Sequence, residues 1–288
     1  MAVAATTETG ARPSWAGRRP SVPGWVGTVP FFAYVAVFLL WPTAIVVVDA
    51  LKNPNGGWAF ANIAKLGDPL VRGYFIGSFK LCLLSSVFGA VFGAILAYAV
   101  ASGNPDGLIR RLYIAVSGLL AQFGGVTLAF AFLVLIGPVG LLFHASWFYS
   151  FPWGITLIYT YFQIPLMVLV FLPAIDGVKV QWREASENLG ASAWQYWRYV
   201  GGPLLMPAFL GSTLLLFANA LSAFATIEAW EDQIAYIVPQ QISTALSSEV
   251  GLNNVNVADL LALGMVIMMA IVMTGYALLL RRAARWLR

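Results

Sequence analysis

The stretch Glu184-Ala185-Ser186-Glu187-Asn188-Leu189-Gly190, continued by Val200-Gly201-Gly202-Pro203, is a polar, helix-forming island in an otherwise apolar chain. Residues 182–189 favour a helix, and a glycine at position 190 can take the positive φ that ends one. Ser192 is a suitable N-cap for a second short helix, which we expect the Gly-Gly-Pro run to end before position 204. The stretch therefore predicts two short helices at an angle, with a large aromatic surface formed by Trp194, Tyr196, Trp197 and Tyr199.

The composition around this island excludes an ordinary soluble domain. Of the 288 residues, 60% are hydrophobic and 10% are charged, whereas charged residues make up about a quarter of a typical soluble domain. The apolar residues form runs long enough to span a bilayer. We predict an all-α, polytopic membrane protein whose six transmembrane helices cover about 26–48, 76–101, 112–136, 153–175, 204–226 and 260–280. Residues 1–25 form a predicted tail, residues 26–288 the transmembrane domain, and residues 176–203 the loop between spans four and five.

The distribution of lysine and arginine predicts which side the loop faces. Three cations fall in the segments assigned to the outside, namely Lys52, Lys65 and Arg72, and Lys80 lies in or near the bilayer. Twelve fall on the other side: Arg12, Arg18, Arg19, Arg110, Arg111, Lys179, Arg183, Arg198, Arg281, Arg282, Arg285 and Arg288. Because basic residues accumulate on the cytoplasmic side of membrane proteins, we expect the loop and both termini to be cytoplasmic in a bacterial inner membrane.

The spacing of the loop resembles the cytoplasmic signature of type I ABC-importer permeases. That pattern is Glu-Ala-Ala, three residues, Gly, nine residues, then Ile-x-Leu-Pro. The matching positions are Glu184, Ala185, Gly190, Val200 and Pro203, with Ser186 in place of the second alanine. Six spans with the signature between spans four and five extend the resemblance to about residues 25–285. Residues 218–224, 237–242 and 257–259 further resemble the branch of polyamine, iron and thiamine systems.

The resemblance implies a permease subunit that imports a small solute by alternating access, with a polyamine-like or other small polar or charged substrate. In this family the loop seats in a cleft of an ATP-binding subunit and transmits its closure to the spans. The implied coupling residues are Glu184, Ala185, Ser186, Gly190, Trp194, Val200 and Pro203. The implied partners are two ATP-binding cassette subunits, a second permease chain (a related one or a copy of this one), an extracytoplasmic solute-binding protein and membrane lipid. Nucleic acid is not an expected partner.

Polar residues inside the predicted spans are candidates for a translocation pathway. Lys80 is costly to bury, so it either faces a partner or a water-filled path, or extends its amine to the outer interface. Gln163, Asn219 and Ser222 lie at mid-membrane depth, where they either line the path or form interhelical hydrogen bonds. Small residues at positions 89, 93, 97 and 101 recur every four residues and predict close helix packing instead.

The sequence offers no catalytic site of its own. It contains no G-x-x-x-x-G-K-[ST] phosphate loop, so we expect no cofactor on this chain, with ATP and Mg on the partner ATPase subunits. One histidine, His144, and one cysteine, Cys82, cannot build a metal cluster. Glu228, Glu231 and Asp232 follow span five and form either a solvated acidic loop or a docking surface. The alternative function, an ion-coupled secondary transporter or channel, favours inverted repeats and convergent ionisable groups, and neither pattern is evident here.

Overall fold

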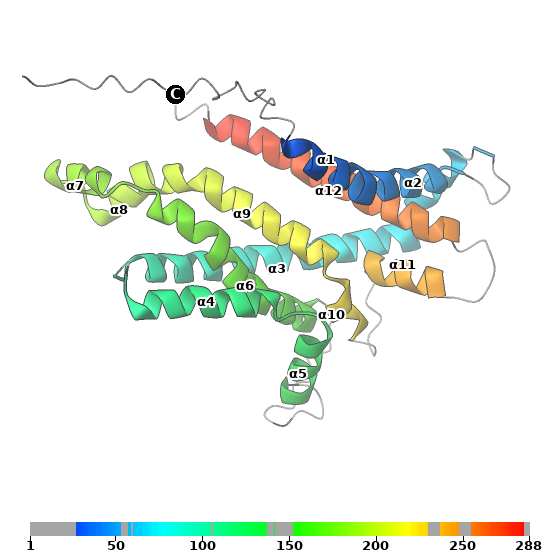
Figure 1. The fold of residues 1–288 in the computed structure, drawn as a ribbon, viewed down its shortest axis with the longest axis horizontal. Helices are drawn as coiled ribbons and strands as arrows, with labels where there is room; N and C mark the ends of the chain where they lie inside the picture. Colours follow the sequence, from blue (N-terminus) through cyan, green and yellow to red (C-terminus); the bar gives the residue numbers. More distant parts are fainter. Residues whose placement is uncertain are drawn as a thin grey trace, which may run out of the picture. The chain divides into compact units, whose positions relative to one another are not determined.

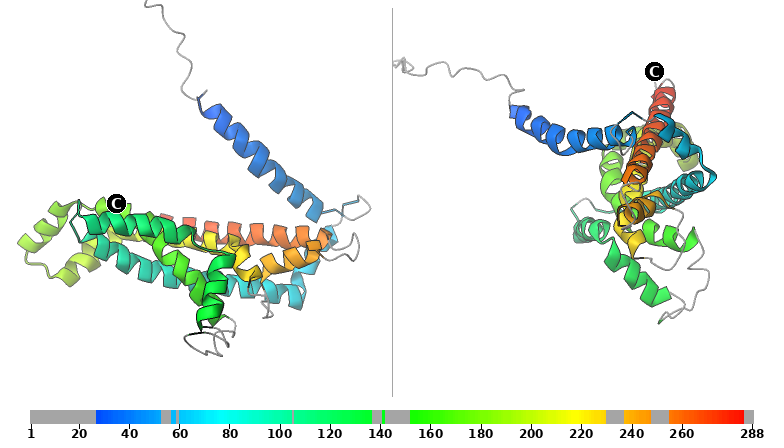
Figure 2. Two further views of the ribbon diagram at one scale, coloured as in Figure 1. Left: turned by 60° about the horizontal axis from the view of Figure 1, so that its bottom comes forward. Right: turned by 90° about the vertical axis from the view of Figure 1, so that its right-hand side faces the viewer.

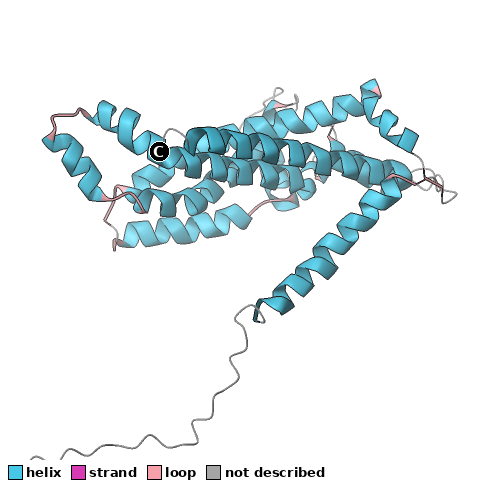
Figure 3. Ribbon diagram, turned by 90° about the horizontal axis from the view of Figure 1, so that it is seen from above, coloured by secondary structure: helices cyan, strands magenta, loops and turns pink. Residues whose placement is uncertain are grey.

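A computed structural model describes residues 27–52, 57–58, 60–104, 106–136, 141, 152–229, 237–247 and 255–284. Within these residues nearly all of the chain is helical, and one isolated bridge between Lys52 and Trp58 is the only β-pairing described (Figure 3). The predicted all-α membrane fold is confirmed: five helices are long and apolar enough to span a membrane, or six if one bent pair is a single span. The predicted tail, residues 1–25, lies outside the described residues.

The chain forms two compact units, residues 1–45 and residues 46–288, which are described separately. The first contains α1 (Val29–Val35), the π-helical turn η2 (Ala36–Leu40) and the start of α2 (Trp41–Ala50). Trp41 N–H donates to the carbonyl of Ala36, five residues back, immediately before Pro42. Pro42 has no N–H to donate, and the wide π-helical turn lies directly before it. The helix therefore continues through the proline. Val29–Ala50 is therefore one candidate span, close to the predicted 26–48.

The second unit is built around α3 (Pro69–Ala101) and α6 (Trp153–Asp176), which pack against each other and against α9 (Gly202–Ser222) (Figure 1). The helix α3 begins at Pro69, two turns before the predicted start of span two at residue 76, because the Asp68 carboxylate caps it by accepting from Leu70 N–H at 2.9 Å. Its 33 residues make a helix about 50 Å long, which exceeds the ~30 Å hydrocarbon core. The predicted outer loop 49–73 also contains a 3-10 helix, η3 (Phe60–Gly67).

Glycines on α3 bring its backbone against α6. A Cβ at Gly93 would lie 2.4 Å from Met167 Cβ, and one at Gly89 would lie 2.6 Å from Gln163 Cβ. Ala97, one turn further along, is fully buried. The predicted packing role of the small-residue stripe is thus confirmed. Buried side chains of α3, α6 and α9 then form the core beside this contact, among them Leu81, Tyr159, Met167 and Leu216.

Span three is not the straight helix predicted for 112–136. It consists of α4 (Leu108–Gln122) and α5 (Val126–Ile136), whose axes differ by 95°. Gly125 at the break has a φ of +76°, a conformation that residues with a Cβ rarely adopt. The Gly124-Gly125 pair therefore turns the chain inside an apolar run that hydropathy alone reads as continuous.

Span five also differs from the prediction. The helix does not end at Gly201-Gly202-Pro203: α8 (Ala193–Tyr196), the π-helical η5 (Trp197–Gly201) and α9 form one candidate span over Ala193–Ser222. It breaks instead at Ala223, before the short α10 (Phe224–Glu228). The segment 227–259, predicted as an external loop, contains α11 (Val238–Ser247), which packs on α12 (Val255–Ala284). Part of α12, Val257–Arg281, is the sixth predicted span.

The two ends of this second unit differ in structure. The loop helix α7 (Val180–Asn188) and α8 extend from one end, and α5, α10 and α11 lie at the other (Figures 1 and 2). The turn between α3 and α4 lies at the same end as α7, because Arg110 at the start of α4 pairs with Asp176 at the end of α6. Two of the segments that the charge count assigned to one side, the turn before α4 and the loop after α6, therefore share one end of the second unit.

Candidate functional site

The loop between α6 and α9 turns at Gly190. Its φ of +76° is the positive value predicted for this glycine. Three backbone hydrogen bonds close the end of α7: Leu189 N to Ala185 O at 3.2 Å, Gly190 N to Glu187 O at 2.9 Å and Ala191 N to Ser186 O at 3.0 Å. The last two are the paired bonds of a Schellman motif, which satisfies carbonyls that a helix end otherwise leaves free. The turn is thus fixed by the backbone, and a Cβ at position 190 would meet no atom within 4 Å.

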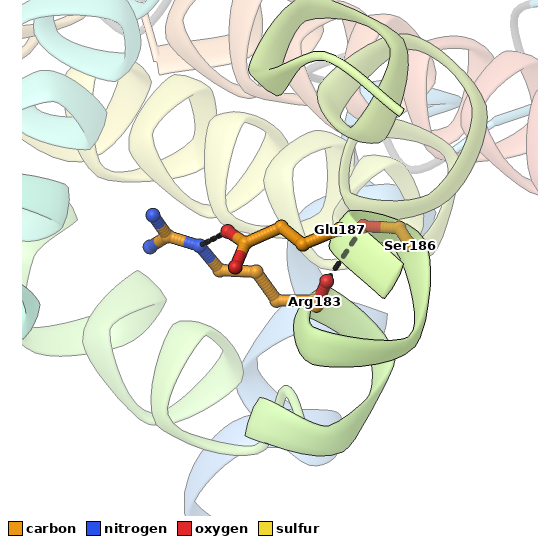
Figure 4. Close-up of polar contacts among 3 residues, drawn as sticks. All are labelled: Arg183, Ser186 and Glu187. Carbon is orange, nitrogen blue, oxygen red and sulfur yellow. Dashed lines mark hydrogen bonds and ion pairs between the residues drawn. The ribbon is translucent and has the colours of Figure 1, made fainter. Parts of the chain in front are cut away.

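One face of α7 carries a local polar network (Figure 4). Arg183 Nε donates to Glu187 Oε1 at 3.0 Å, and Ser186 Oγ donates to the Arg183 carbonyl at 2.7 Å. The adjacent carboxylate raises the pKa of the Arg183 guanidinium, so this side chain is charged at every physiological pH. Glu184 and Ala185 are exposed beside this network, and Ser186 is half-buried. The hydroxyl that replaces the family's second alanine is therefore used within α7.

The second limb of the loop begins at Ser192, as predicted. Ser192 Oγ accepts from Gln195 N–H at 3.3 Å, and Gln195 Oε1 accepts from Ser192 N–H at 2.7 Å. This reciprocal capping box satisfies two amide groups that the start of a helix leaves free. Together with the turn at Gly190, it sets the angle between α7 and α8.

A π-helical turn makes the second limb continuous with the membrane helix. Gly202 N–H donates to the carbonyl of Trp197, five residues back, and a Cβ at Gly202 would lie 2.5 Å from that carbonyl oxygen. Pro203 follows in the first turn of α9 and is exposed. Glycine at 202, where the family pattern has leucine, thus permits the close backbone contact of the wide turn. α8, η5 and α9 therefore form one continuous helical segment.

The predicted aromatic surface divides into two faces. Trp194 and Tyr199 point outward with 73% and 70% of their surface exposed, beside Leu189 at 88%. Tyr196 is buried and Trp197 half-buried, and both pack toward the bundle. Val200 is half-buried as well. The outward face has the exposed apolar anchors that a docking surface needs.

The candidate pathway residues do not converge on one place. Gln163 is fully buried, and its Nε2 donates to Ser85 Oγ at 3.0 Å, so it joins α6 to α3. Lys80 lies exposed on α3, about three turns from the start of that helix. Ser222 is exposed and Asn219 half-buried on α9, where Ser222 Oγ donates to the Asn219 carbonyl at 3.0 Å.

Ser222 also lines a cavity at the end of the bundle opposite the loop. This cavity has a volume of about 590 Å³ and lies between the end of α9, α11 and α12. Its other lining residues are Leu221, Phe224, Pro239, Ile242, Ser243, Leu246 and Met265. A mostly apolar wall with two serine hydroxyls can orient a small solute while binding it weakly.

Two side chains that the sequence reading missed hold the broken helices in place. Tyr159 on α6 is buried and donates its hydroxyl to the carbonyl of Ala223, where α9 ends. Thr226 on α10 is also buried, and its Oγ1 accepts from Gly125 N–H at 3.1 Å, at the break between α4 and α5. Each bond satisfies a backbone group freed by a break, as the interior of a membrane requires. The two breaks are therefore joined to each other through α10.

Among the described residues, no group of three or more His, Cys, Asp or Glu side chains is placed to hold a metal ion. His144, Glu231 and Asp232 lie outside the described residues, whereas Glu228 is exposed at the end of α10. The described helices thus combine several candidate membrane spans with a capped loop that exposes apolar side chains at one end.

Residues 87–288 match the family model described as "Binding-protein-dependent transport system inner membrane component". The chain belongs to this family of multi-pass inner-membrane permeases, and the predicted type I importer permease class is confirmed. Its relatives are transport permeases, and the ATPase of such systems is a separate subunit.

Individual relatives agree with the family match. The sulfate transport system permease protein CysT of Escherichia coli (strain K12) is 25% identical over 224 residues, which cover 71% of this chain and 76% of that protein. The molybdenum transport system permease protein ModB of the same organism is 30% identical over 157 residues, or 52% of this chain and 68% of ModB. The thiamine transport system permease protein ThiP of Salmonella typhimurium is 24% identical over 224 residues, or 73% of this chain but 39% of ThiP.

A solved structure shows the same fold. A bacterial ABC transporter involved in the import of the acidic polysaccharide alginate matches with a TM-score of 0.70 at 16% identity, covering 90% of this chain and 94% of that chain.

Proposed function

We propose that the chain is a membrane subunit of an ATP-driven importer and moves a small solute by alternating access. The observation that carries the proposal is the loop of residues 176–203. Its turn is fixed by backbone hydrogen bonds, its tip exposes Leu189, Trp194 and Tyr199, and its second limb runs into α9 without a break. A rigid apolar knob joined directly to a membrane helix suits the transmission of force from a soluble partner.

The loop would seat in a groove of an ATP-binding subunit, with ATP and Mg held by that subunit. Glu184, Ala185, Ser186, Gly190, Trp194, Val200 and Pro203 are the proposed coupling residues. Trp194 supplies the anchor, Gly190 sets the angle of the knob, and the turn before Pro203 passes its displacement to α9. Closure of two ATP-binding subunits favours one orientation of the spans over the other because the loop binds differently in the two states.

The proposed assembly contains two ATP-binding subunits, a second permease chain, either a related one or a copy of this one, and an extracytoplasmic solute-binding protein. In this assembly the end of the bundle that carries α7 and α8 faces the cytoplasm, together with both termini. The excess of arginine and lysine on the segments at this end supports that orientation.

The proposed substrate is a small polar or charged solute. The relatives named above are permeases of sulfate, molybdenum or thiamine transport systems, and local motifs favour a polyamine-like solute. The transport assay therefore includes both anionic and cationic solutes. The proposed pathway residues are Ser222, which lines the cavity near α11, Asn219, whose carbonyl accepts from Ser222 Oγ, and Lys80. Gln163 joins α6 to α3 in this conformation, so we assign it an interhelical role.

Reconstitution tests this function. The chain is expressed with the ATP-binding and binding-protein genes of its own operon, purified and placed in proteoliposomes. We expect an ATPase subunit to co-purify in fixed ratio, and uptake of one solute from a panel of sulfate, molybdate, thiamine and spermidine to require both ATP and the binding protein. Uptake by the chain alone under an ion gradient, without ATP, would instead support an ion-coupled transporter.

A further inference from the structure

Two cavities of different character adjoin at the base of the loop. The first has a volume of about 260 Å³ and is lined by the ends of α3 and α6, the start of α7 and the η5 turn. The second has a volume of about 380 Å³ and extends between α3, α6 and α9. They share four lining residues, Tyr98, Ile175, Trp197 and Leu205, so they lie next to each other, and the two together are called the depression below.

The outer cavity is positively charged. Lys179 and Arg183 line it, four residues apart and therefore on one face of the helix start. No acidic side chain lines it within the described part of the chain. Two carboxylates near this cavity in sequence are engaged: Glu187 accepts from Arg183 Nε, and Asp176 pairs with Arg110. Glu184 is exposed and does not line the cavity, so Lys179 and Arg183 are the charged side chains of its lining.

The inner cavity is apolar. Its side chains include Phe171, Phe209 and Leu205, and no charged residue lines it within the described part of the chain. Ile95 and Met206 also line it, and they are 63% and 49% exposed on the side of the bundle. In a membrane-spanning protein such side chains face the acyl chains of the bilayer, so the inner cavity opens toward lipid.

We propose that this depression binds one anionic phospholipid. The phosphate lies between Lys179 and Arg183, and one acyl chain enters the slot between α3, α6 and α9. Basic residues beside membrane helices bind anionic headgroups, whereas an acyl chain needs a dry apolar slot, and here the two features adjoin. A free inorganic anion would gain no binding energy from the apolar slot. A soluble peptide could not enter the slot from the bilayer.

The position of the depression gives the bound lipid a role. Its walls come from α7, η5 and the ends of α3 and α6, which are the elements that join the loop to the bundle. A lipid seated there stabilises the loop in the position observed here. This inference requires only that the chain lies in a membrane, and does not depend on the identity of the solute or the direction of transport.

The test uses the purified permease–ATPase complex, delipidated in detergent and titrated with dioleoyl-phosphatidylglycerol or dioleoyl-phosphatidylcholine. Native mass spectrometry then counts the bound lipid. Each lost cation should weaken phosphatidylglycerol binding about fivefold, so Lys179→Gln with Arg183→Gln should weaken it about 25-fold. The same variant should weaken phosphatidylcholine binding less, because the choline cation offsets the charge of the phosphate that both lipids carry. Arg111→Gln is the control, because Arg111 is an exposed cation of α4 that lines neither cavity.

A second variant tests the slot. Ala94→Trp places a large side chain in the inner cavity and should reduce the binding of both lipids. Unchanged phosphatidylglycerol affinity in the Lys179 and Arg183 double variant would overturn the proposal. So would full competition by millimolar inorganic phosphate, which would indicate a free-anion site. Loss of the ATPase subunit from the double variant, with lipid binding retained, would assign the two cations to the protein interface instead.

Discussion

Trp197 of η5 packs edge to face against Tyr98 near the end of α3, with ring centroids 5.2 Å apart and ring planes at 83°. This contact links the loop to a helix that is distant in sequence. The same tryptophan supplies the carbonyl that closes the π-helical turn leading into α9. A displacement of the loop therefore reaches α9 through the backbone and α3 through an aromatic pair.

The first prediction concerns this pair. A double-mutant cycle of Tyr98→Leu and Trp197→Leu should give an interaction energy of about 0.5–1.5 kcal/mol, because edge-to-face rings attract beyond their buried area. The free energy of unfolding in mixed micelles measures it. The control cycle pairs Tyr98→Leu with Tyr199→Leu, whose ring is mostly exposed, and should be additive. If the two single-variant effects add in both cycles, the Tyr98–Trp197 contact does not contribute to the proposed coupling between the loop and α3.

The second prediction concerns the turn of the loop. Gly190→Asp and Glu184→Lys should each lower ATP-dependent uptake at least about tenfold, because each places a new charge in the proposed docking surface, where an unpaired charge is costly. Aspartate at position 190 also strains the turn, because the φ of +76° there suits glycine. The spans should stay folded, since a side chain at 190 meets no atom within 4 Å and Glu184 is exposed. Uptake in proteoliposomes and the helical circular dichroism signal are the measurements.

Gly103→Asp is the matched control for that experiment. It places the same charge in the exposed turn between α3 and α4, at the same end of the bundle but outside the loop. We expect it to transport at close to the unmodified rate. Normal uptake by the Gly190 and Glu184 variants would reject the assignment of the loop.

The third prediction concerns the bond between the two broken helices. Thr226→Val keeps the shape of the side chain but removes the acceptor of Gly125 N–H, so it should cost about 1–3 kcal/mol in the free energy of unfolding. Thr226→Ser retains the hydroxyl, so its free energy of unfolding should fall by less. A larger loss of unfolding free energy in Thr226→Ser than in Thr226→Val would mean that packing by the methyl group, not the hydrogen bond, stabilises the break.

The fourth prediction concerns the contact between α3 and α6. Gly93→Ala should lower the free energy of unfolding by about 1–3 kcal/mol, because its Cβ would lie 2.4 Å from Met167 Cβ and 2.8 Å from the Ile164 carbonyl oxygen. Gly73→Ala, on the same helix but with no atom within 4 Å of its Cβ, should be neutral or stabilising. A thermal melt of the two variants side by side tests the difference. If both melt alike, close approach at Gly93 is not required.

Local chemistry made much of this fold predictable. The positive φ of Gly190 and the cap at Ser192 depend on one residue and its immediate neighbours, and both were expected. The stripe at Gly89 and Gly93 was expected for a similar reason, since small residues on one helix face indicate close packing. Spans four and six followed from the lengths of their apolar runs.

The breaks in the helices were not predictable in the same way. The 95° bend near Gly125 lies in a run as apolar as any straight span, and its stability depends on Thr226, which is 101 residues away. The break at Ala223 similarly depends on Tyr159. Conversely, Gly202 and Pro203 predict a helix end, yet the π-helical turn before them accommodates the proline without ending the helix. In each case a distant partner or an alternative hydrogen bond outweighed the local propensity.

The most direct test of the coupling role is a photo-cross-link from the tip of the loop. A photoreactive amino acid replaces Trp194 in the complex with its ATPase, and the same group at Ile109, which is 80% exposed near the start of α4, serves as the control. We expect Trp194 to capture the ATP-binding subunit with a yield that changes between ATP and the nucleotide-free state, and Ile109 to capture it weakly and independently of nucleotide. Absence of a cross-link from position 194 in a complex that still transports would contradict the assignment.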